Sequence, residues 1–248
     1  MIEICARVHN RDEIETILAQ GFKTLEITLP SKGGIEEEYA WSELAAQKNL
    51  TLIGHGPKEG NPRDLASLEN DCLPRLKQAL EAAGRLKAAL LTIHFNVDSR
   101  WIPAETIQRK IALLTQVVQW GAESGVRVNL ENLSESSADL EKALLMVPDL
   151  GLTLDVGHAM LTHKTSTAPD IITHLSGRIS HLHLHDNHGG KSYRDDEHLI
   201  PGEGKVEFTK LFGLLKKKGY QKTATLELAP HEMALGQKRI AAFWRDAF

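Results

Sequence analysis

The sequence is poor in the residues that mark several large classes of protein. It has only two cysteines, Cys5 and Cys72, and their separation matches no metal-ligand spacing, so neither a disulfide framework nor a zinc knuckle is expected. No apolar run approaches the roughly 18 residues of a membrane span. Glu3, Arg7 and Arg11 interrupt the N-terminal segment where a signal peptide needs an apolar core. These absences predict a cytoplasmic protein with no membrane partner.

An excess of positive charge is also missing. Lys and Arg number 29 against 33 Asp and Glu, and the formal net charge of −4 provides no global attraction to nucleic acid or to an anionic membrane. A local basic rim can still bind DNA, so nucleic acid is disfavoured as a partner but not excluded. Hydrophobic residues make up 42% of the chain and charged residues 25%, which is typical of a globular protein with a sizeable core.

The length and the order of the segments predict one (β/α)8 TIM barrel of the α/β class. At 248 residues the chain is close to the roughly 250 typical of this fold, and no linker divides it, so a single domain over residues 1–248 is expected. Short β-branched or Leu-rich runs alternate with longer amphipathic stretches, as in βα units around a parallel sheet. The predicted strands are Ile2–Val8, Thr24–Leu29, Leu50–Gly54, Ala89–His94, Val126–Glu131, Gly151–Asp155, Ile179–His185 and Thr223–Leu228. The clearest predicted helices are Arg11–Gln20, Glu37–Gln47, Asp64–Ala83, Ala104–Ser124, Ser137–Val147 and Phe208–Lys218.

One connection is much longer than the others. The segment from Asp186 to Lys205 is rich in Gly, Asp and His and is too long for a turn. Within it, Asp196 and His198 are followed by Pro201-Gly202-Glu203-Gly204, a tight-turn sequence that would fold the segment back over the barrel mouth. The connection is therefore predicted to be a functional loop.

A triplet of polar, aliphatic and ligand-type residues recurs at the carboxyl ends of the predicted strands. Residues two apart in a strand point to the same face, so the first and third side chains of each triplet share the inward face. Active sites of TIM barrels lie at this end, where the ligand-type residues would converge. The triplets are Thr92-Ile93-His94, Asn129-Leu130-Glu131, Thr153-Leu154-Asp155, His181-Leu182-His183 and Thr225-Leu226-Glu227, with Ile53-Gly54-His55 as a weaker sixth.

Carboxylates among the converging residues predict a bound cation. Glu131, Asp155 and Glu227 would repel one another inside a barrel unless they are protonated, paired or bound to a cation. Together with His183 they form a mixed nitrogen and oxygen ligand set, which suits zinc or manganese, with magnesium and cobalt as alternatives. One divalent metal ion held by these four residues is the predicted core of the site.

Several histidines leave alternatives open. His181 and His185 share the strand parity of His183 and compete with it as the ligand, although strand depth favours His183. His158 follows Asp155 by three residues, and it is predicted as a ligand, as a hydrogen-bond partner of the substrate or as a helix cap.

The remaining candidates have a structural interpretation that competes with the functional one. A single strand-end histidine, such as His55 or His94, is more often a hydrogen-bonded structural residue than a ligand. Glu26 is predicted to form a structural ion pair rather than to point into the barrel mouth. Solvent-exposed positions are predicted for the other histidines, namely His9, His163, His174, His188 and His231.

Taken together, these motifs resemble the xylose isomerase-like TIM-barrel superfamily, which contains sugar isomerases and epimerases as well as endonuclease IV. The resemblance covers essentially the whole chain. In the epimerase-like members it implies one divalent metal held by the residues matching Glu131, Asp155, His183 and Glu227, with the two glutamates flanking the substrate carbon. The matching segments are Gly54-His55-Gly56-Pro57, Thr92-Ile93-His94, Leu130-Glu131-Asn132, Leu154-Asp155-Val156-Gly157-His158, His183-Leu184-His185-Asp186-Asn187, Asp196-Glu197-His198, Pro201-Gly202-Glu203-Gly204 and Leu226-Glu227.

The resemblance to endonuclease IV implies a different site, a cluster of three zinc ions. Its ligand types all have counterparts, because His55, His94, His158, Asp196 and His198 join the four core residues. The motifs around Asp155 and His183 nevertheless look more like the sugar isomerase branch, and Lys58 stands where the nuclease usually has tyrosine. The chain is also shorter than is usual for the nuclease, which leaves less material for DNA-contacting loops.

The resemblance and the ligand pattern together predict a metal-dependent isomerase or epimerase of a sugar or sugar phosphate. The metal would polarise a carbonyl and the neighbouring hydroxyl, Glu131 and Glu227 would act as base and acid, and His158 would orient a substrate oxygen. The alternative is an endonuclease IV-like zinc-dependent phosphodiesterase acting on abasic DNA. A catalytically silent sugar-binding barrel is disfavoured by the carboxylates. The predicted partner is a small sugar or sugar phosphate, and a homodimer is a possible assembly.

Overall fold

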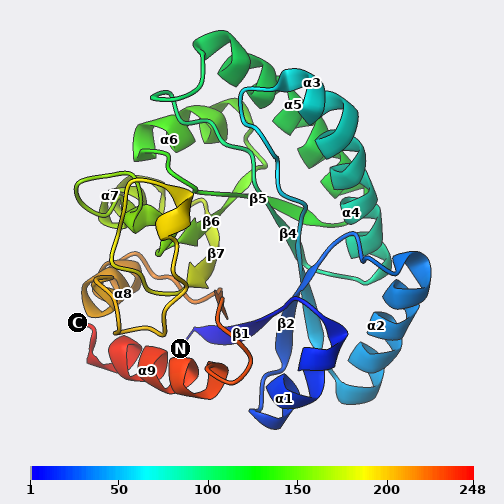
Figure 1. Ribbon diagram of the computed structural model, residues 1–248, viewed down its shortest axis with the longest axis vertical. Helices are drawn as coiled ribbons and strands as arrows, with labels where there is room; N and C mark the ends of the chain where they lie inside the picture. Colours follow the sequence, from blue (N-terminus) through cyan, green and yellow to red (C-terminus); the bar gives the residue numbers. More distant parts are fainter. Residues whose placement is uncertain (1) are drawn as a thin grey trace. The chain divides into compact units, whose positions relative to one another are not determined.

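Eight parallel strands follow one another in chain order around a closed barrel, with helices between them (Figure 1). This computed structural model describes residues 2–248, apart from the side chain of Tyr193. The predicted (β/α)8 barrel is confirmed, with strand ends within two residues of the predicted ones. The strands are β1 (Glu3–Val8), β2 (Thr24–Thr28), β3 (Thr51–His55), β4 (Leu90–Ile93), β5 (Arg127–Glu131), β6 (Gly151–Asp155), β7 (Ile179–Leu184) and β8 (Thr223–Leu226).

Each of the clearest predicted helical segments is helical in the structure, which also contains two further helices. The α-helices are α1 (Ile14–Ala19), α2 (Gly34–Lys48), α3 (Leu65–Ser67), α4 (Leu73–Arg85), α5 (Ala104–Glu123), α6 (Ser137–Met146), α7 (Ala168–Leu175), α8 (Phe208–Lys217) and α9 (Met233–Asp246). Short turns of other helix types are η1 (Arg11–Glu13), η2 (Leu68–Cys72), η3 (His158–Met160) and η4 (Tyr193–Asp195). Helices α7 and α9 were not among the clearest predicted segments.

The predicted helix Asp64–Ala83 is interrupted. It consists of α3, the π-helical turn η2 and α4. Pro74 lies in the first turn of α4, where it lacks the N–H that would continue the hydrogen-bond ladder of an uninterrupted α-helix. The amphipathic pattern therefore predicted the extent of the helical segment but not this change of winding.

Internal contacts divide the described residues into two compact parts, each of which is described by itself. The first part comprises residues 2–22, 132–137 and 152–248, and the second part comprises residues 23–131 and 138–151. Met1 lies outside the described residues, and the single domain over residues 1–248 stays a prediction.

In the first part, strand register aligns the ligand-type residues. Asp155 of β6 pairs with His183 of β7, and His183 pairs with Thr225 of β8. Cys5 of β1 also pairs with Thr225, so the register brings Arg7 level with Glu227, two residues further along each chain. Because residues two apart share a face, these side chains belong to the same inward face.

In the second part, register aligns a corresponding set. His55 of β3 pairs with Thr92 of β4, which pairs with Asn129 of β5. Two residues further on are His94 and Glu131, which therefore share this face. Thr92 and Asn129 are fully buried, as expected for the interior of the sheet.

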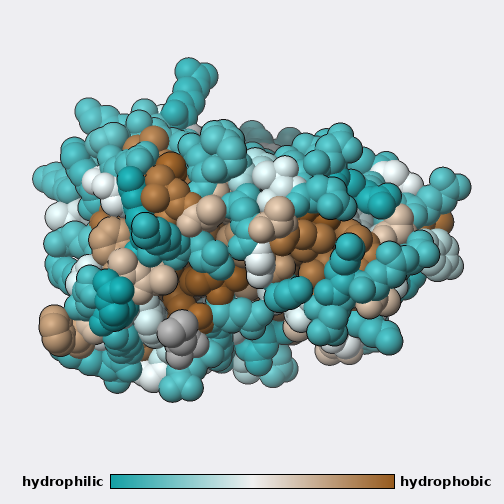
Figure 2. Space-filling view, turned by 90° about the horizontal axis from the view of Figure 1, so that it is seen from below, coloured by the Kyte–Doolittle hydropathy of each residue, from teal (hydrophilic) through white to brown (hydrophobic). Residues whose placement is uncertain are grey.

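The face of the molecule drawn in Figure 2 is mostly polar. Figure 2 shows one face, on which hydrophilic residues predominate and hydrophobic ones gather in the hollows between them. Over residues 2–248, no helix combines the length and the apolar character needed to cross a bilayer.

Candidate metal centre

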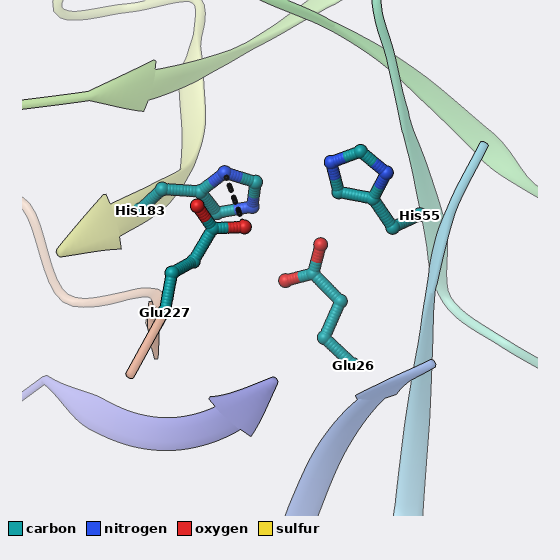
Figure 3. A group of neighbouring side chains, drawn as sticks. All are labelled: Glu26, His55, His183 and Glu227. Atoms are coloured by element: carbon teal, nitrogen blue, oxygen red, sulfur yellow. Dashed lines mark ion pairs between the residues drawn. The ribbon is translucent and has the colours of Figure 1, made fainter. Parts of the chain in front are cut away.

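Three ligand-type side chains meet at the carboxyl ends of β6, β7 and β8. His183 Nδ1 lies 3.4 Å from Glu227 Oε1, the pair drawn with a dashed line in Figure 3, and 3.8 Å from Asp155 Oδ2. Asp155 and His183 are fully buried and Glu227 is 9% exposed. Strand parity predicted this grouping from the sequence, because each residue ends a polar-aliphatic-ligand triplet.

Asn132 holds the end of β6 in place. Its side-chain Nδ2 donates to the carbonyl of Asp155 at 2.9 Å, and its Oδ1 accepts from the Asp155 N–H at 2.8 Å. The Asp155 carboxylate in turn accepts from the backbone N–H of His158 at 2.7 Å. These contacts fix the carboxylate direction before any ligand is bound, which is the usual role of groups that surround a metal ligand.

A second group of side chains surrounds Asp196, in the long connection after β7. Asp196 Oδ2 lies 3.2 Å from His158 Nε2 and 3.0 Å from His198 Nε2. The rings of His185 and His198 are stacked, with centroids 4.0 Å apart. The sequence placed Asp196 and His198 among the candidate ligands, and the structure brings both together with His158.

His185 links this group to Asp155. Its Nε2 lies 3.1 Å from Asp155 Oδ1, and its Nδ1 lies 3.7 Å from Asp196 Oδ1. His185 Nδ1 and Asp196 Oδ1 are both buried without a hydrogen-bond partner among the described residues. The ligand atoms of Asp155, His158 and His185 lie within 4.8 Å of one another, as do those of His185, Asp196 and His198. Nitrogen and oxygen atoms that could bind a cation therefore lie close together, as a metal site requires.

The pKa values of Asp196 and His198 are shifted in opposite directions. Burial raises the pKa of Asp196, but hydrogen bonds from His158 and His198 outweigh it and hold that pKa far below its usual range. Burial lowers the pKa of His198, but the hydrogen bond to Asp196 and the charge of Glu227 outweigh it and raise the pKa to about 9. In the metal-free protein, Asp196 and His198 therefore form a carboxylate–imidazolium pair near neutral pH.

Arg7 is a site residue that the sequence analysis did not assign. Its side chain is 6% exposed, and Nε lies 3.8 Å from Glu227 Oε1. The signal was available, because Arg7 lies two residues beyond Cys5 on an inward-facing parity of β1. In the sequence, Arg7 enters the argument only as a charge that interrupts an apolar segment.

Asp186 and Asn187 fix the long connection, another role that the sequence analysis did not assign. The fully buried Asp186 carboxylate accepts backbone N–H groups at 2.8 to 2.9 Å. The donors are Asn187, Gly202, Gly204 and Val206. Asn187 Nδ2 donates to the Gly157 carbonyl at 2.9 Å. The Asp186 carboxylate thus ties the start of the connection that carries Asp196 and His198 to its end.

The second part contains a compact group of its own. Glu131 Oε2 lies 2.9 Å from His94 Nε2 and 3.3 Å from His55 Nε2, and the two imidazole rings are edge-on with centroids 5.0 Å apart. Glu131 is 1% exposed. Glu26 of β2 is fully buried and points towards His55 in Figure 3, with ligand atoms of the two residues within 4.8 Å. His55 and His94 therefore share a carboxylate.

The other histidines have different environments. His181 lies on the ligand face but deeper, with its ring nitrogens 2.7 Å from Thr223 Oγ1 and 2.9 Å from Thr225 Oγ1. His188 is exposed and pairs with Glu197. His163 is only half-buried rather than exposed, with Nε2 2.7 Å from the Ser134 carbonyl. This last difference arises because the segment after η3 folds back onto residues 132–137.

The comparisons with known proteins identify the family. The sequence profile of the xylose isomerase-like TIM barrel matches residues 14–246, so the chain belongs to that family. Fructoselysine 3-epimerase of Shigella flexneri is 26% identical over 223 residues, which cover 85% of this chain and 78% of the relative. A D-tagatose 3-epimerase-like protein has a similar structure, with a TM-score of 0.83, 22% identity and coverage of 98% of this chain and 97% of that one.

A further solved structure shows the same fold with a metal. The IOLI protein, described with a bound zinc atom, has a TM-score of 0.79 and 18% identity and covers 100% of this chain and 99% of that one. At this identity the likeness concerns the fold, and the zinc atom belongs to that protein.

Proposed function

We propose that this chain is a divalent-metal-dependent isomerase or epimerase of a sugar or sugar phosphate. The observation that carries the proposal is the buried grouping of Asp155, His183 and Glu227 at adjacent strand ends. Membership of the xylose isomerase-like family and similarity to a protein named as a sugar epimerase support this class of activity.

The donor set fits a divalent cation. Two carboxylates beside an imidazole, all with little or no exposure, are costly to bury. Arg7, 3.8 Å from Glu227, offsets part of this cost, and a divalent cation among the three residues would offset more of it. Mixed imidazole and carboxylate ligands suit zinc and manganese, and magnesium and cobalt are alternatives. We propose Asp155, His183 and Glu227 as ligands, and we add Glu131 on its sequence position and on the family resemblance alone. His55, His94, His158, Asp196 and His198 stay predicted additional ligands.

The roles of the residues follow from proton transfer at a sugar carbon. A bound metal would supply Lewis-acid polarisation of a carbonyl and its neighbouring hydroxyl. Glu227 and Glu131 are the proposed pair that removes and returns the proton at the adjacent carbon. His158, held through its backbone by Asp155, is proposed to orient a substrate oxygen.

Solvent exchange tests the proposal directly. Protein loaded with Mn²⁺ or Zn²⁺ is incubated in deuterium oxide with a panel of ketoses and ketose phosphates, and NMR follows the carbon next to the carbonyl. We expect deuterium to appear there together with the epimeric or isomeric sugar. Absence of exchange across the whole panel, in protein shown to contain metal, would contradict the proposal.

A second candidate is a zinc-dependent phosphodiesterase acting on abasic DNA. Two observations favour it, namely that His55 and His94 share the Glu131 carboxylate, and that His158, Asp196 and His198 form a group. Clustered zinc ions could generate hydroxide and stabilise a leaving alkoxide. Elemental analysis of protein purified without added metal discriminates between the candidates, because about three zinc ions per chain with nicking of abasic duplex favours the nuclease.

A further inference from the structure

Glu59 and Lys110 are buried opposite charges that the proposed chemistry does not use. Glu59 follows β3 and is 5% exposed, and Lys110 lies on α5 and is 1% exposed. The two side chains form an ion pair. Burial raises the pKa of Glu59 above its usual value, and the Lys110 charge only partly offsets this effect. Burying such a pair is expensive, and an apolar pair of similar volume often gives equal or greater stability.

The pair holds both backbone groups of one residue. Glu59 Oε2 accepts the N–H of Asn96 at 2.7 Å, and Lys110 Nζ donates to the carbonyl of Asn96 at 2.7 Å. Lys110 Nζ also lies 5.7 Å from the centroid of the Phe95 ring. The main chain directly after β4 is therefore clamped between an acid from one loop and a base from a helix.

The clamp lies next to the two histidines of the second part. Glu59 is four residues beyond His55, and Asn96 is two residues beyond His94. The pair thus joins the loop that follows His55 to the loop that follows His94. His55 Nε2 and His94 Nε2 lie 3.3 Å and 2.9 Å from the same oxygen of Glu131. A small change in the distance between the two imidazoles would therefore break one of these contacts.

We propose that Glu59 and Lys110 are positioning residues, which set the spacing of His55 and His94 so that both imidazoles contact Glu131. The pair acts through Asn96 and touches neither metal nor substrate. The effect on the site rests on the assignment of these histidines as additional ligands in the proposed function. The contact of both imidazoles with Glu131 depends on the pair whether or not the two histidines bind a metal.

A double substitution separates positioning from stability. Glu59→Met or Lys110→Met alone leaves a buried charge without its partner, and each is expected to lower the unfolding temperature. Glu59→Met with Lys110→Met removes both charges, so we expect its unfolding temperature to lie above that of either single variant. It also removes both contacts to the Asn96 backbone, so we expect the recovery to be partial. Glu59→Gln with Lys110→Met is the conservative variant, because the glutamine oxygen can still accept the Asn96 N–H.

Crystal structures and Zn²⁺ titrations of these variants give the two measurements. In the Met–Met variant we expect residues 94–98 to shift and the contact from His94 Nε2 to Glu131 to lengthen beyond 3.5 Å, the limit of a hydrogen bond. Zn²⁺ affinity should fall roughly tenfold, as is usual when groups that support metal ligands are lost. The variant with Glu59→Gln should regain part of this affinity.

Arg109→Met is the matched control, because Arg109 is adjacent to Lys110 and pairs with Glu69 at the surface.

The outcomes are distinguishable. If the folded Met–Met variant keeps the His94 contact to Glu131 at 2.9 Å, the positioning claim is overturned whatever its metal affinity. If the wild-type protein binds no Zn²⁺ but the contact lengthens in the variant, the positioning claim stands and the metal assignment fails. Equal loss of affinity in the Arg109→Met control would also count against a specific role for the pair.

Discussion

At the scale of single residues, the position of His185 depends on the absence of a side chain at Gly157. A Cβ at Gly157 would lie 2.0 Å from His185 Cε1, and such a contact forces the imidazole to move. His185 contacts both Asp155 and Asp196, so its displacement would disturb the whole loop side of the site. We predict that Gly157→Ala costs about 1–3 kcal/mol in unfolding free energy through overpacking. Zn²⁺ affinity should fall by about tenfold or more, as judged by isothermal titration.

The control for this variant is Gly177→Ala. A Cβ at Gly177 would meet no heavy atom within 4 Å, and the residue lies in the same part of the chain. We expect wild-type Zn²⁺ affinity from this variant. Unchanged affinity in Gly157→Ala would show that His185 does not contribute to the metal centre.

The charges of His198 and Asp196 predict a pH dependence for the metal-free protein. The pKa of His198 is raised from 6.5 to about 9, so its contribution to stability is complete below pH 6.5 and is lost as pH rises through about 9. The pKa of Asp196 is lowered from 3.8, so its contribution is present above pH 3.8 and is lost at lower pH. Because the His198 side chain is 40% exposed, we expect a contribution of only about 1 kcal/mol.

Thermal unfolding of chelator-treated protein between pH 6 and pH 10 measures the alkaline limb. The wild-type unfolding temperature should fall more steeply above pH 6.5 than that of His198→Asn, which cannot acquire the charge. Parallel curves for the two proteins would contradict the predicted ion pair.

Residues in a strand or directly after it were predictable, whereas residues that depend on a distant partner were not. Asp155, His183 and Glu227 followed from parity, because a period of two fixes the face of each side chain. Glu59 and Lys110 carry no such pattern, since their pairing arises only when α5 packs beside the loop after β3. Asp186 looked like part of a motif, but its backbone donors lie up to 20 residues away.

At the scale of elements, the connection from Asp186 to Lys205 owes its shape to one carboxylate. We predict that Asp186→Ala destabilises the protein by roughly 3 kcal/mol, since each buried donor without an acceptor costs about 1–3 kcal/mol and water replaces part of the loss. The exposed residues Lys191 and Arg194 lie within this connection. Limited trypsin digestion should therefore cleave the variant there at a protease concentration that leaves the wild type intact.

Glu197→Gln is the control for loop digestion. Glu197 lies in the same connection, but it is 40% exposed and pairs with the exposed His188. Exposed pairs contribute little, so this variant should resist trypsin like the wild type. Resistance of Asp186→Ala would show that the loop is held by contacts other than this carboxylate.

Apolar periodicity predicted the existence of most elements, but it did not predict the interruption before α4. Long amphipathic segments such as α5 were located from periodicity, because an apolar face buried against the sheet repeats along the helix. The break before α4 was missed because the apolar periodicity continues across it, although Pro74, which lacks an N–H, was a signal of it in the sequence. Helix α7 has only eight residues and was not among the clearest segments, because so short a helix gives few repeats of the pattern.

At the scale of the whole molecule, alternation of strands and helices was sufficient to predict the barrel, since parallel strands joined by helices have few ways to bury both faces. The same alternation says nothing about the substrate, because one barrel serves many chemistries through its loops. The matched family supports the class of activity, and the proposed metal would connect the site to the stability of the fold.

A bound metal should stabilise the entire fold by mass action. A ligand at 100 times its dissociation constant stabilises the native state by about 2.7 kcal/mol, which for a chain of this size raises the unfolding temperature by about 5–10 °C. We predict a shift of this size when Mn²⁺ or Zn²⁺ is added to chelator-treated protein, followed by differential scanning calorimetry. Asp155→Asn should abolish most of the shift, because it removes a buried ligand charge while keeping an oxygen that can accept the His158 N–H. Asp71→Asn removes an exposed carboxylate that pairs with Arg75, and it should leave the shift unchanged. If both variants retained the full shift, the stabilising metal would have to bind away from Asp155, and the proposed ligand set would be wrong.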